Sequence, residues 1–379
     1  MPRIERAPRE PAVASSWRAD LRAAALPWIV SRVLVLIALG TARRVVDHVG
    51  ARARPIALGQ GLLGWDAAFY GDIARGGYRA VEHGGLRFFP LLPLLGRAVG
   101  WLPFVSARGG VIAVANIAAF AAAVLLIRLV TAETGDRALA TRSAMVLLLA
   151  PHAFVFVMGY AESLLCAAAL ATFVGLRREH WWLAVVAGFA AGLCRPVGVL
   201  LVLPALVEAA RAWRAGSARV APALAVLAPG LGLLTYLLWV RDRTGDFFLA
   251  LRLQNQPNLR GGNESPVRSV AHAFHELFSG ERVGYGLHAI TAVVVVVLVV
   301  VIARRLPASY TVYAGASVLV SLCAHNLDSI ERYSLSTFPL AIAAAMLLRR
   351  PAVERVTLLL IASGMVAAAV LAFTGSLVP

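Results

Sequence analysis

Four polar segments interrupt an otherwise apolar chain, and each carries a side chain that could handle a proton or an anion. The segments are Trp65–Tyr78, Met158–Ser163, Arg195-Pro196 and His325–Tyr333. Asp66 and Glu162 supply carboxylates, which can accept a proton from a hydroxyl group. Arg195 and Arg332 supply guanidinium groups, whose planar fork of donors holds two phosphate oxygens at once. This combination favours proton transfer next to a bound phosphate.

Each of these side chains also has an ordinary interpretation. Trp65, Phe69 and Ile73 fall at helical spacing, so Asp66 stands at the beginning of a short amphipathic helix. From that segment alone a helix cap is the favoured role for Asp66, and capping is as good an interpretation as function for Glu162. Each arginine could instead extend to the membrane interface or pair with Asp328 or Glu331.

The composition determines the class of protein. Hydrophobic residues make up 60% of the 379 residues and charged residues only 15%, whereas soluble domains carry about 25% charged residues. Uncharged runs such as Val283–Ala303 are long enough to cross a hydrocarbon core about 30 Å thick. The sequence therefore predicts an all-α polytopic membrane protein.

The net charge of +16 comes entirely from arginine, since the chain contains no lysine. The arginines stand between the apolar runs, as membrane topology requires, and no segment resembles a nucleic-acid-binding module. We therefore interpret the charge as a topology signal and expect no nucleic-acid partner.

Arginine placement predicts about eleven transmembrane helices in one domain, residues 23–379, after a cytoplasmic tail, residues 1–22. Most short arginine-bearing turns then lie inside, while loops 42–108 and 241–284 lie outside. Pro196 divides residues 181–210 into two short helices, which keeps the arginine pattern consistent. The predicted helices are 23–41, 109–128, 142–159, 162–176, 181–194, 196–210, 219–240, 285–303, 308–324, 334–348 and 354–373.

This topology rests on arginine placement alone, yet it places all four polar segments on the non-cytoplasmic side. Carboxylates and arginines gathered at that face indicate chemistry on a lipid-linked phosphate compound. The semi-apolar stretch 88–104 has both of its ends outside, so we expect it to lie in the interface or to enter the membrane and return.

The segments also resemble a known family in both order and spacing. Trp65–Tyr78 and Arg87–Pro93, which read WDAAFYGDIARGGY and RFFPLLP, resemble the first-loop motifs of the PIG-V family of GPI mannosyltransferase 2. The motifs Tyr160–Leu164, Cys194–Gly198 and Arg332-Tyr333 with Phe338-Pro339 resemble later family segments. The chain is thus similar to a bacterial member of this family, and the resemblance spans most of its length.

The resemblance implies a GT-C type glycosyltransferase in the plasma membrane that takes mannose, or a related sugar, from a polyprenyl-phosphate carrier. It implies that Asp66 is the general base of an inverting transfer, and that Arg332 and Arg195 neutralise the donor phosphate. The acceptor is expected to be a lipid or a glycan. Further candidates to contact or orient the substrate are Trp65, Tyr70, Tyr160, Glu162, Gln254, Glu331 and Tyr333.

Two alternatives stay open at this point. A transporter or flippase for polyprenyl-linked sugars would place ionisable residues along a path near the midplane, and Arg32 is the clearest such residue. A non-catalytic membrane subunit of cell-envelope assembly is the other. We expect no required cofactor, although Asp72 and His83 could assist a divalent metal.

Overall fold

The computed structural model describes residues 17–49, 55–216, 220–256, 259–279, 283–327 and 330–379. Within these residues all regular secondary structure is helical, apart from one isolated bridge between Asn263 and Ala324. The α-helices are α1 Trp17–Val49, α2 Ile56–Gln60, α3 Asp66–Gly76, α4 Leu91–Val99, α5 Ala107–Thr134, α6 Arg137–Leu149, α7 Glu162–Arg177, α8 Trp181–Cys194, α9 Val202–Arg214, α10 Val220–Thr244, α11 Leu249–Arg252, α12 Pro266–Ser279, α13 Val283–Arg305, α14 Ala308–Leu322, α15 Ile330–Leu335, α16 Pro339–Leu347 and α17 Pro351–Phe373. Short 3-10 segments lie between them: η1 Gly61–Leu63, η2 Tyr78–Ala80, η3 His83–Arg87, η4 Ala153–Phe156, η5 Pro196–Leu201 and η6 Leu253–Asn255.

Six helical segments of the described chain are long and apolar enough to cross a membrane, which confirms a polytopic helical membrane protein. They are Trp17–His48, Ala107–Thr134, Pro196–Arg214, Val220–Thr244, Leu287–Arg305 and Pro351–Phe373. Trp181–Cys194 and Ala308–Leu322 are apolar but shorter. The first helix also begins earlier than predicted, at Trp17, within the stretch assigned to the cytoplasmic tail.

The prediction of one continuous helix over residues 142–159 is wrong. Helix α6 ends at Leu149, and residues 153–156 form the 3-10 segment η4 instead. Pro151 explains the break, because proline has no N–H and clashes with the preceding turn. Arg32 donates to the carbonyl of Phe156 at 3.0 Å, and Asn116 donates to that of Val157 at 2.9 Å. Irregular backbone between apolar helices is tolerated where such donors satisfy it, so Arg32 has a structural role here.

The predicted helix 334–348 is likewise two helices, α15 and α16, with a break at Ser336-Thr337. Pro339 occupies the first turn of α16, where its missing N–H costs least. The break allows α15 to stand at its own angle, and this short helix carries Arg332 and Tyr333.

The predicted division of residues 181–210 is confirmed. Helix α8 ends at Cys194, and Pro196 begins η5, which continues into α9. The turn brings backbone very close to backbone, since a Cβ atom on Gly198 would lie 2.1 Å from the carbonyl oxygen of Ala191. Any larger residue at position 198 would push η5 away from α8 and displace Arg195.

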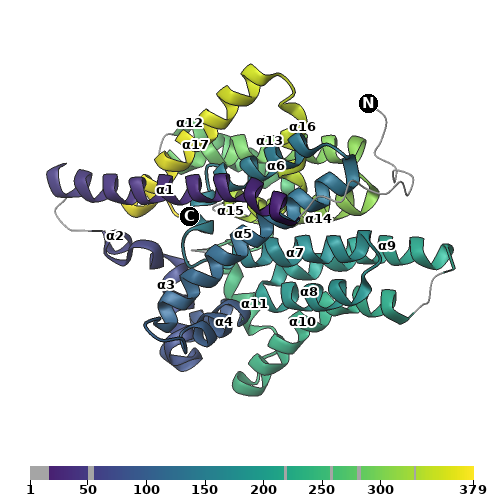
Figure 1. The fold of residues 1–379 in the computed structure, drawn as a ribbon. Coiled ribbons are helices and arrows are strands. Elements are labelled where there is room, and N and C mark those ends of the chain that lie inside the picture. The colour runs from purple at the N-terminus through teal and green to yellow at the C-terminus, as the bar shows by residue number, and fades with distance from the viewer. Residues whose placement is uncertain (1–16, 50–54, 217–219, 257–258, 280–282, 328–329) are drawn as a thin grey trace.

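Ion pairs show which helix ends meet. Asp20 of α1 pairs with Arg128 and Arg137, both at 2.9 Å, and Arg142 pairs with Glu354 at 2.8 Å. Most of the arginine-bearing turns predicted to share one side thus gather at one end of the bundle, whereas the four polar segments gather at the other. In Figure 1, α7, α8 and α10 run side by side, with α3 and α4 toward one end and the end of α9 at the opposite one.

Candidate active site

A cavity of about 200 Å³ opens where the four polar segments meet. Side chains from α3, η3, the turn before α7, the α8–η5 junction, the second long loop and α15 surround it. Its lining consists of Trp65, Asp66, Tyr70, Arg87, Phe88, Phe89, Tyr160, Arg195, Pro196, Gln254, Leu259, Arg260, Arg332, Tyr333, Val378 and Pro379. Residues separated by more than 250 positions in the sequence therefore face one small space.

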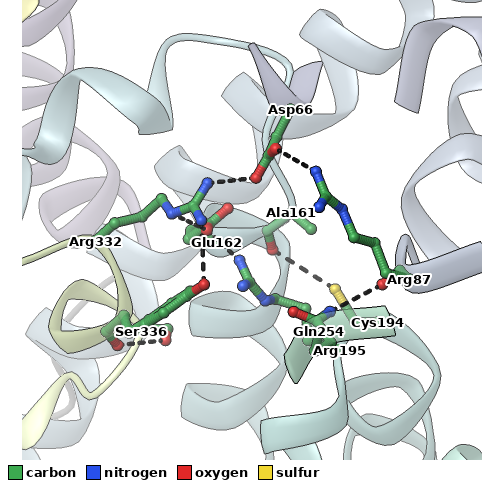
Figure 2. Close-up of polar contacts among 10 residues, drawn as sticks. Asp66, Arg87, Ala161, Glu162, Cys194, Arg195, Gln254, Arg332 and Ser336 are labelled. Atoms are coloured by element: carbon green, nitrogen blue, oxygen red, sulfur yellow. Dashed lines mark hydrogen bonds and ion pairs between the residues drawn. The ribbon is translucent and has the colours of Figure 1, made fainter. Parts of the chain in front are cut away.

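Asp66 is aimed into the cavity by an unusual backbone conformation at the preceding residue. Trp65 has φ of 59°, a region that residues other than glycine rarely adopt, and its indole N–H donates to Ala372 of α17 at 2.9 Å. The Asp66 carboxylate makes no capping bond. It accepts from Arg332 at 2.6 Å and lies 3.7 Å from Arg87, as Figure 2 shows. The capping interpretation of Asp66 is therefore wrong.

Glu162 is the first residue of α7 and likewise makes no capping bond. Its side chain is 1% exposed, and its Oε1 atom lies 3.2 Å from Arg332 Nε while also pairing with Arg195. Arg332 thus bridges Asp66 and Glu162, and Glu162 in turn bridges the two arginines (Figure 2). The capping interpretation of Glu162 is also wrong.

Arginines outnumber carboxylate side chains around the cavity. Arg87, Arg195, Arg260 and Arg332 line it, while Asp66 and Glu162 supply the carboxylate side chains of the described network. The ring of Tyr333 lies between 5.1 and 6.0 Å from three of the guanidinium groups. A small space lined by four arginines attracts an anion such as a phosphate.

The same charges control the ionisation of the site. Burial opposes ionisation of Asp66, but the positive charges of Arg332 and Arg87, with the hydrogen bond from Arg332, outweigh it and lower its pKa. Burial also opposes ionisation of Tyr333, yet Arg332 and Arg195 lower the pKa of that phenol. Asp66 is therefore a carboxylate at neutral pH, held as the partner of an arginine.

Comparison with known families identifies the class of enzyme. Residues 88–325, well over half of the chain, match the model of glycosyltransferase family 87. The chain belongs to glycosyltransferase family 87. It is therefore a membrane glycosyltransferase of the GT-C type, as the sequence predicted. No curated protein matches the chain.

The matched range contains Glu162 and Arg195 but neither Asp66 nor Arg332. The motifs at Trp65–Tyr78 and at Arg332-Tyr333, which carry much of the PIG-V resemblance, thus lie outside it. The family confirms glycosyl transfer, and the PIG-V relationship remains a prediction.

The family 87 chain brings most of the predicted site residues together. Tyr70 packs edge-on against Phe88 with ring centres 5.1 Å apart, and Gln254 donates to the carbonyl of Arg87 at 3.1 Å. Tyr160 faces the guanidinium of Arg332 at 5.4 Å. Two predicted residues do not line the cavity: Glu162 lies behind it against Arg195 and Arg332, whereas Glu331 contacts His288 instead.

The sequence patterns did not predict two of the cavity arginines as site residues. Arg87 stands directly before the Phe-Phe-Pro motif, which was a usable signal, and its guanidinium packs over Phe69 and Phe88. Arg260 lies in the second long loop, where nothing in the sequence distinguishes it from its neighbours. The loop is held by hydrogen bonds from Arg260 to Val320 at 2.7 Å and from the Asn326 N–H to the Arg260 carbonyl at 3.0 Å.

One of the two predicted metal partners has other contacts. Asp72 pairs with Arg108 and lies 3.7 Å from Arg75, so its charge is already compensated. Among the residues that the structure describes, no three His, Cys, Asp or Glu side chains come together as a metal site.

A second, larger cavity of about 490 Å³ lies next to the first, between α3, α4 and α10. The two are separated by the segment Phe88–Pro90, whose first two residues line the small cavity and whose last lines the large one. The large cavity is lined mainly by apolar and aromatic residues: Ile73, Tyr78, Pro90, Pro93, Leu94, Leu193, Tyr236 and Trp239, with Arg79, Arg97 and Arg243 among the remaining lining residues.

Proposed function

We propose that this family 87 enzyme transfers a mannosyl or related residue from a polyprenyl-phosphate donor to a lipid or glycan acceptor. The observation that carries the proposal is the small cavity itself, in which a carboxylate lies among four arginines at one end of a membrane-embedded bundle. The arginine distribution supports a plasma-membrane enzyme with this end on the non-cytoplasmic side. Mannose is supported by the PIG-V resemblance alone.

In the proposed reaction Asp66 removes the proton from an acceptor hydroxyl as its oxygen attacks the anomeric carbon. The bond between that carbon and the phosphate oxygen breaks on the opposite face, so the configuration inverts. The donor phosphodiester carries one negative charge and the released polyprenyl phosphate carries two. Arg332, Arg195 and Arg260 would stabilise the added charge, and such a leaving group needs no separate general acid.

The ion pair between Arg332 and Asp66 implies that donor binding precedes proton transfer. At 2.6 Å the arginine occupies the carboxylate and makes it a weak base. A donor phosphate that binds Arg332 would compete with Asp66 for the same donors and release the carboxylate. Asp66 would thus become an effective base only when the donor is present, which protects the site from unproductive proton transfer.

The larger cavity suits the hydrocarbon chain of the donor, since it is apolar and lies across one stretch of backbone from the arginines. Trp65, Tyr70, Tyr160, Gln254 and Tyr333 line the small cavity, where they could contact the sugar. Glu162 would keep Arg195 and Arg332 in place between successive turnovers.

The test uses the full-length enzyme in proteoliposomes, with radiolabelled polyprenyl-phosphomannose as donor and a lipid extract of the host membranes as acceptor. We expect labelled product from the wild type and none from Asp66→Asn protein that is equally well folded. Farnesyl phosphate should bind Asp66→Asn protein several-fold more tightly than wild type, because Arg332 no longer has a competing partner. Transfer from a nucleotide-sugar alone would overturn the lipid donor.

The transporter alternative has less support from the structure. Arg32, its clearest candidate, is engaged by Asn116 at 2.9 Å, by Ser31 and by two backbone carbonyls, and it forms part of the helix packing. A non-catalytic subunit would not require a carboxylate poised among arginines in a cavity. Movement of labelled donor across the bilayer without product formation would favour the transporter.

A further inference from the structure

Glu331 and Arg332 are neighbours in α15 but serve different surroundings. Arg332 lines the small cavity, while both carboxylate oxygens of Glu331 are bonded to Nδ1 of His288 in α13, at 2.9 and 3.0 Å. The Glu331 and His288 residues are only 7% and 5% exposed. Burying a carboxylate and an imidazole together costs desolvation free energy, so their presence at this depth indicates a specific role.

Helix α15 cannot hold its own position. It has six residues, too few for a helix to be stable by itself, so packing and side-chain bonds must fix it. Ile330 and Leu335 supply buried apolar contacts, which resist displacement but allow rotation. The bond from Glu331 to His288 is directional and lies one residue from Arg332, so it fixes the rotation of α15.

We propose that Glu331 and His288 form a positioning pair that sets the direction in which Arg332 meets the donor phosphate; this inference rests on the proposed function. Neither residue touches the substrate. The pair acts by holding the guanidinium between Asp66 and Glu162, at 2.6 and 3.2 Å, where an incoming phosphate can take over its donors.

The pair also keeps a negative charge away from the phosphate site. If His288 were lost, Glu331 would be a buried carboxylate without this partner, one residue from Arg332, and it would compete with phosphate for that arginine. The other imidazole near Glu331 is His152, in the turn before η4, which is 2% exposed. Its Nδ1 atom has no hydrogen-bond partner among the described residues, so His152 provides no equivalent directional bond.

The experiment compares His288→Asn, which keeps a side-chain N–H donor, with His288→Leu, which removes it. Purified full-length protein in detergent is titrated with farnesyl phosphate and, separately, with farnesol, which lacks the phosphate. We expect His288→Leu to weaken farnesyl phosphate binding about tenfold, the usual cost of losing a group that orients a ligand-binding side chain. Farnesol binding should not change, and His288→Asn should restore most of the loss.

Glu331→Leu should lose the same phosphate affinity, and the double variant should be no worse than either single one, since both remove one interaction. The matched control is Glu208→Gln, which alters an equally buried carboxylate at the opposite end of the bundle and should leave both ligands unaffected. Equal losses for farnesol and farnesyl phosphate, or no loss for either, would overturn the proposal. The titration is independent of catalysis, so a protein that transfers no sugar could still show the predicted loss.

Discussion

Among the buried clusters of arginine and carboxylate in the described residues, two lie at opposite ends of the helix bundle and differ in how their side-chain charges balance. At the end opposite the cavity, Arg177 binds both oxygens of Glu133 at 2.6 and 2.8 Å and one oxygen of Glu208 at 2.8 Å. Arg211 lies 3.5 Å from Glu208, and the Ser309 hydroxyl donates a hydrogen bond to Glu208 at 2.7 Å. Two positive charges therefore meet two negative ones.

The second cluster has four arginines for two carboxylates and encloses a cavity, whereas no residue of the Arg177 cluster lines either of the two cavities described above. The Arg177 cluster joins α5, α7, α9 and α14, and its positive and negative side chains pair with one another. The same residue types thus form a structural tie where the side-chain charges balance, and a candidate site where arginines outnumber carboxylate side chains beside a cavity. Buried ion pairs alone do not identify a site; their imbalance beside an open space does.

The largest effect that this comparison predicts is the loss of transfer in Asp66→Asn. A positioned general base contributes 10²- to 10⁴-fold, so the initial rate should fall by about that factor. Thermal unfolding should scarcely change, because Arg332 keeps Glu162 as a partner. Asp72→Asn, which alters a carboxylate in the same helix outside the cavity, should retain its activity. A fully active Asp66→Asn enzyme would contradict the assignment of the base.

Arg332→Lys should reduce transfer by about 10²-fold, since an ammonium group cannot bridge two carboxylates and a phosphate as a guanidinium does. The corresponding change at the balanced cluster, Arg177→Lys, should lower the unfolding temperature and leave the rate per folded molecule intact. Transfer rates and unfolding curves of both variants, measured side by side, would check this contrast. If both variants lost only stability, both clusters would have a purely structural role.

Glu208→Gln should destabilise the protein by about 3 kcal/mol, because it leaves Arg177 and Arg211 with one carboxylate fewer in a buried setting. The transfer rate of the folded fraction should be unchanged. Denaturation monitored by circular dichroism, together with the rate per folded molecule, would measure the two quantities. A selective loss of rate would mean that the balanced cluster also participates in function.

Arg87→Gln should cause the smallest change, a shift in the pH dependence of transfer. Arg87 is one of the cations that lower the pKa of Asp66, so its removal should raise that pKa. Because Asp66 acts as a carboxylate, transfer is lost as the pH falls through its pKa, and the variant should lose activity at a higher pH than wild type. Arg108→Gln, which alters an arginine paired with Asp72, should leave the profile unchanged.

Much of the fold follows from local chemistry in the sequence. Apolar runs mark the helices, and Pro196 marks the break that the structure confirms. The sequence is less informative where a break depends on its surroundings. Pro151 is a visible break signal after α6, but the irregular backbone that follows it is stable because Arg32 and Asn116, from two other helices, satisfy the freed carbonyls. A linear pattern does not show those partners, so it predicts residues 142–159 as one span.

The sequence by itself determined the class of protein, the gathering of its four polar segments at one end of the bundle, and the residue types available there. Hydropathy and arginine placement are properties of single segments, and the membrane acts on each segment directly. The tertiary structure decided how those residues are used. It took Asp66 and Glu162 out of their expected capping roles, turned Glu331 away toward His288, and added Arg87 and Arg260 to the cavity. These contacts join residues as much as 266 positions apart, and only the packing of the helices brings such residues into contact.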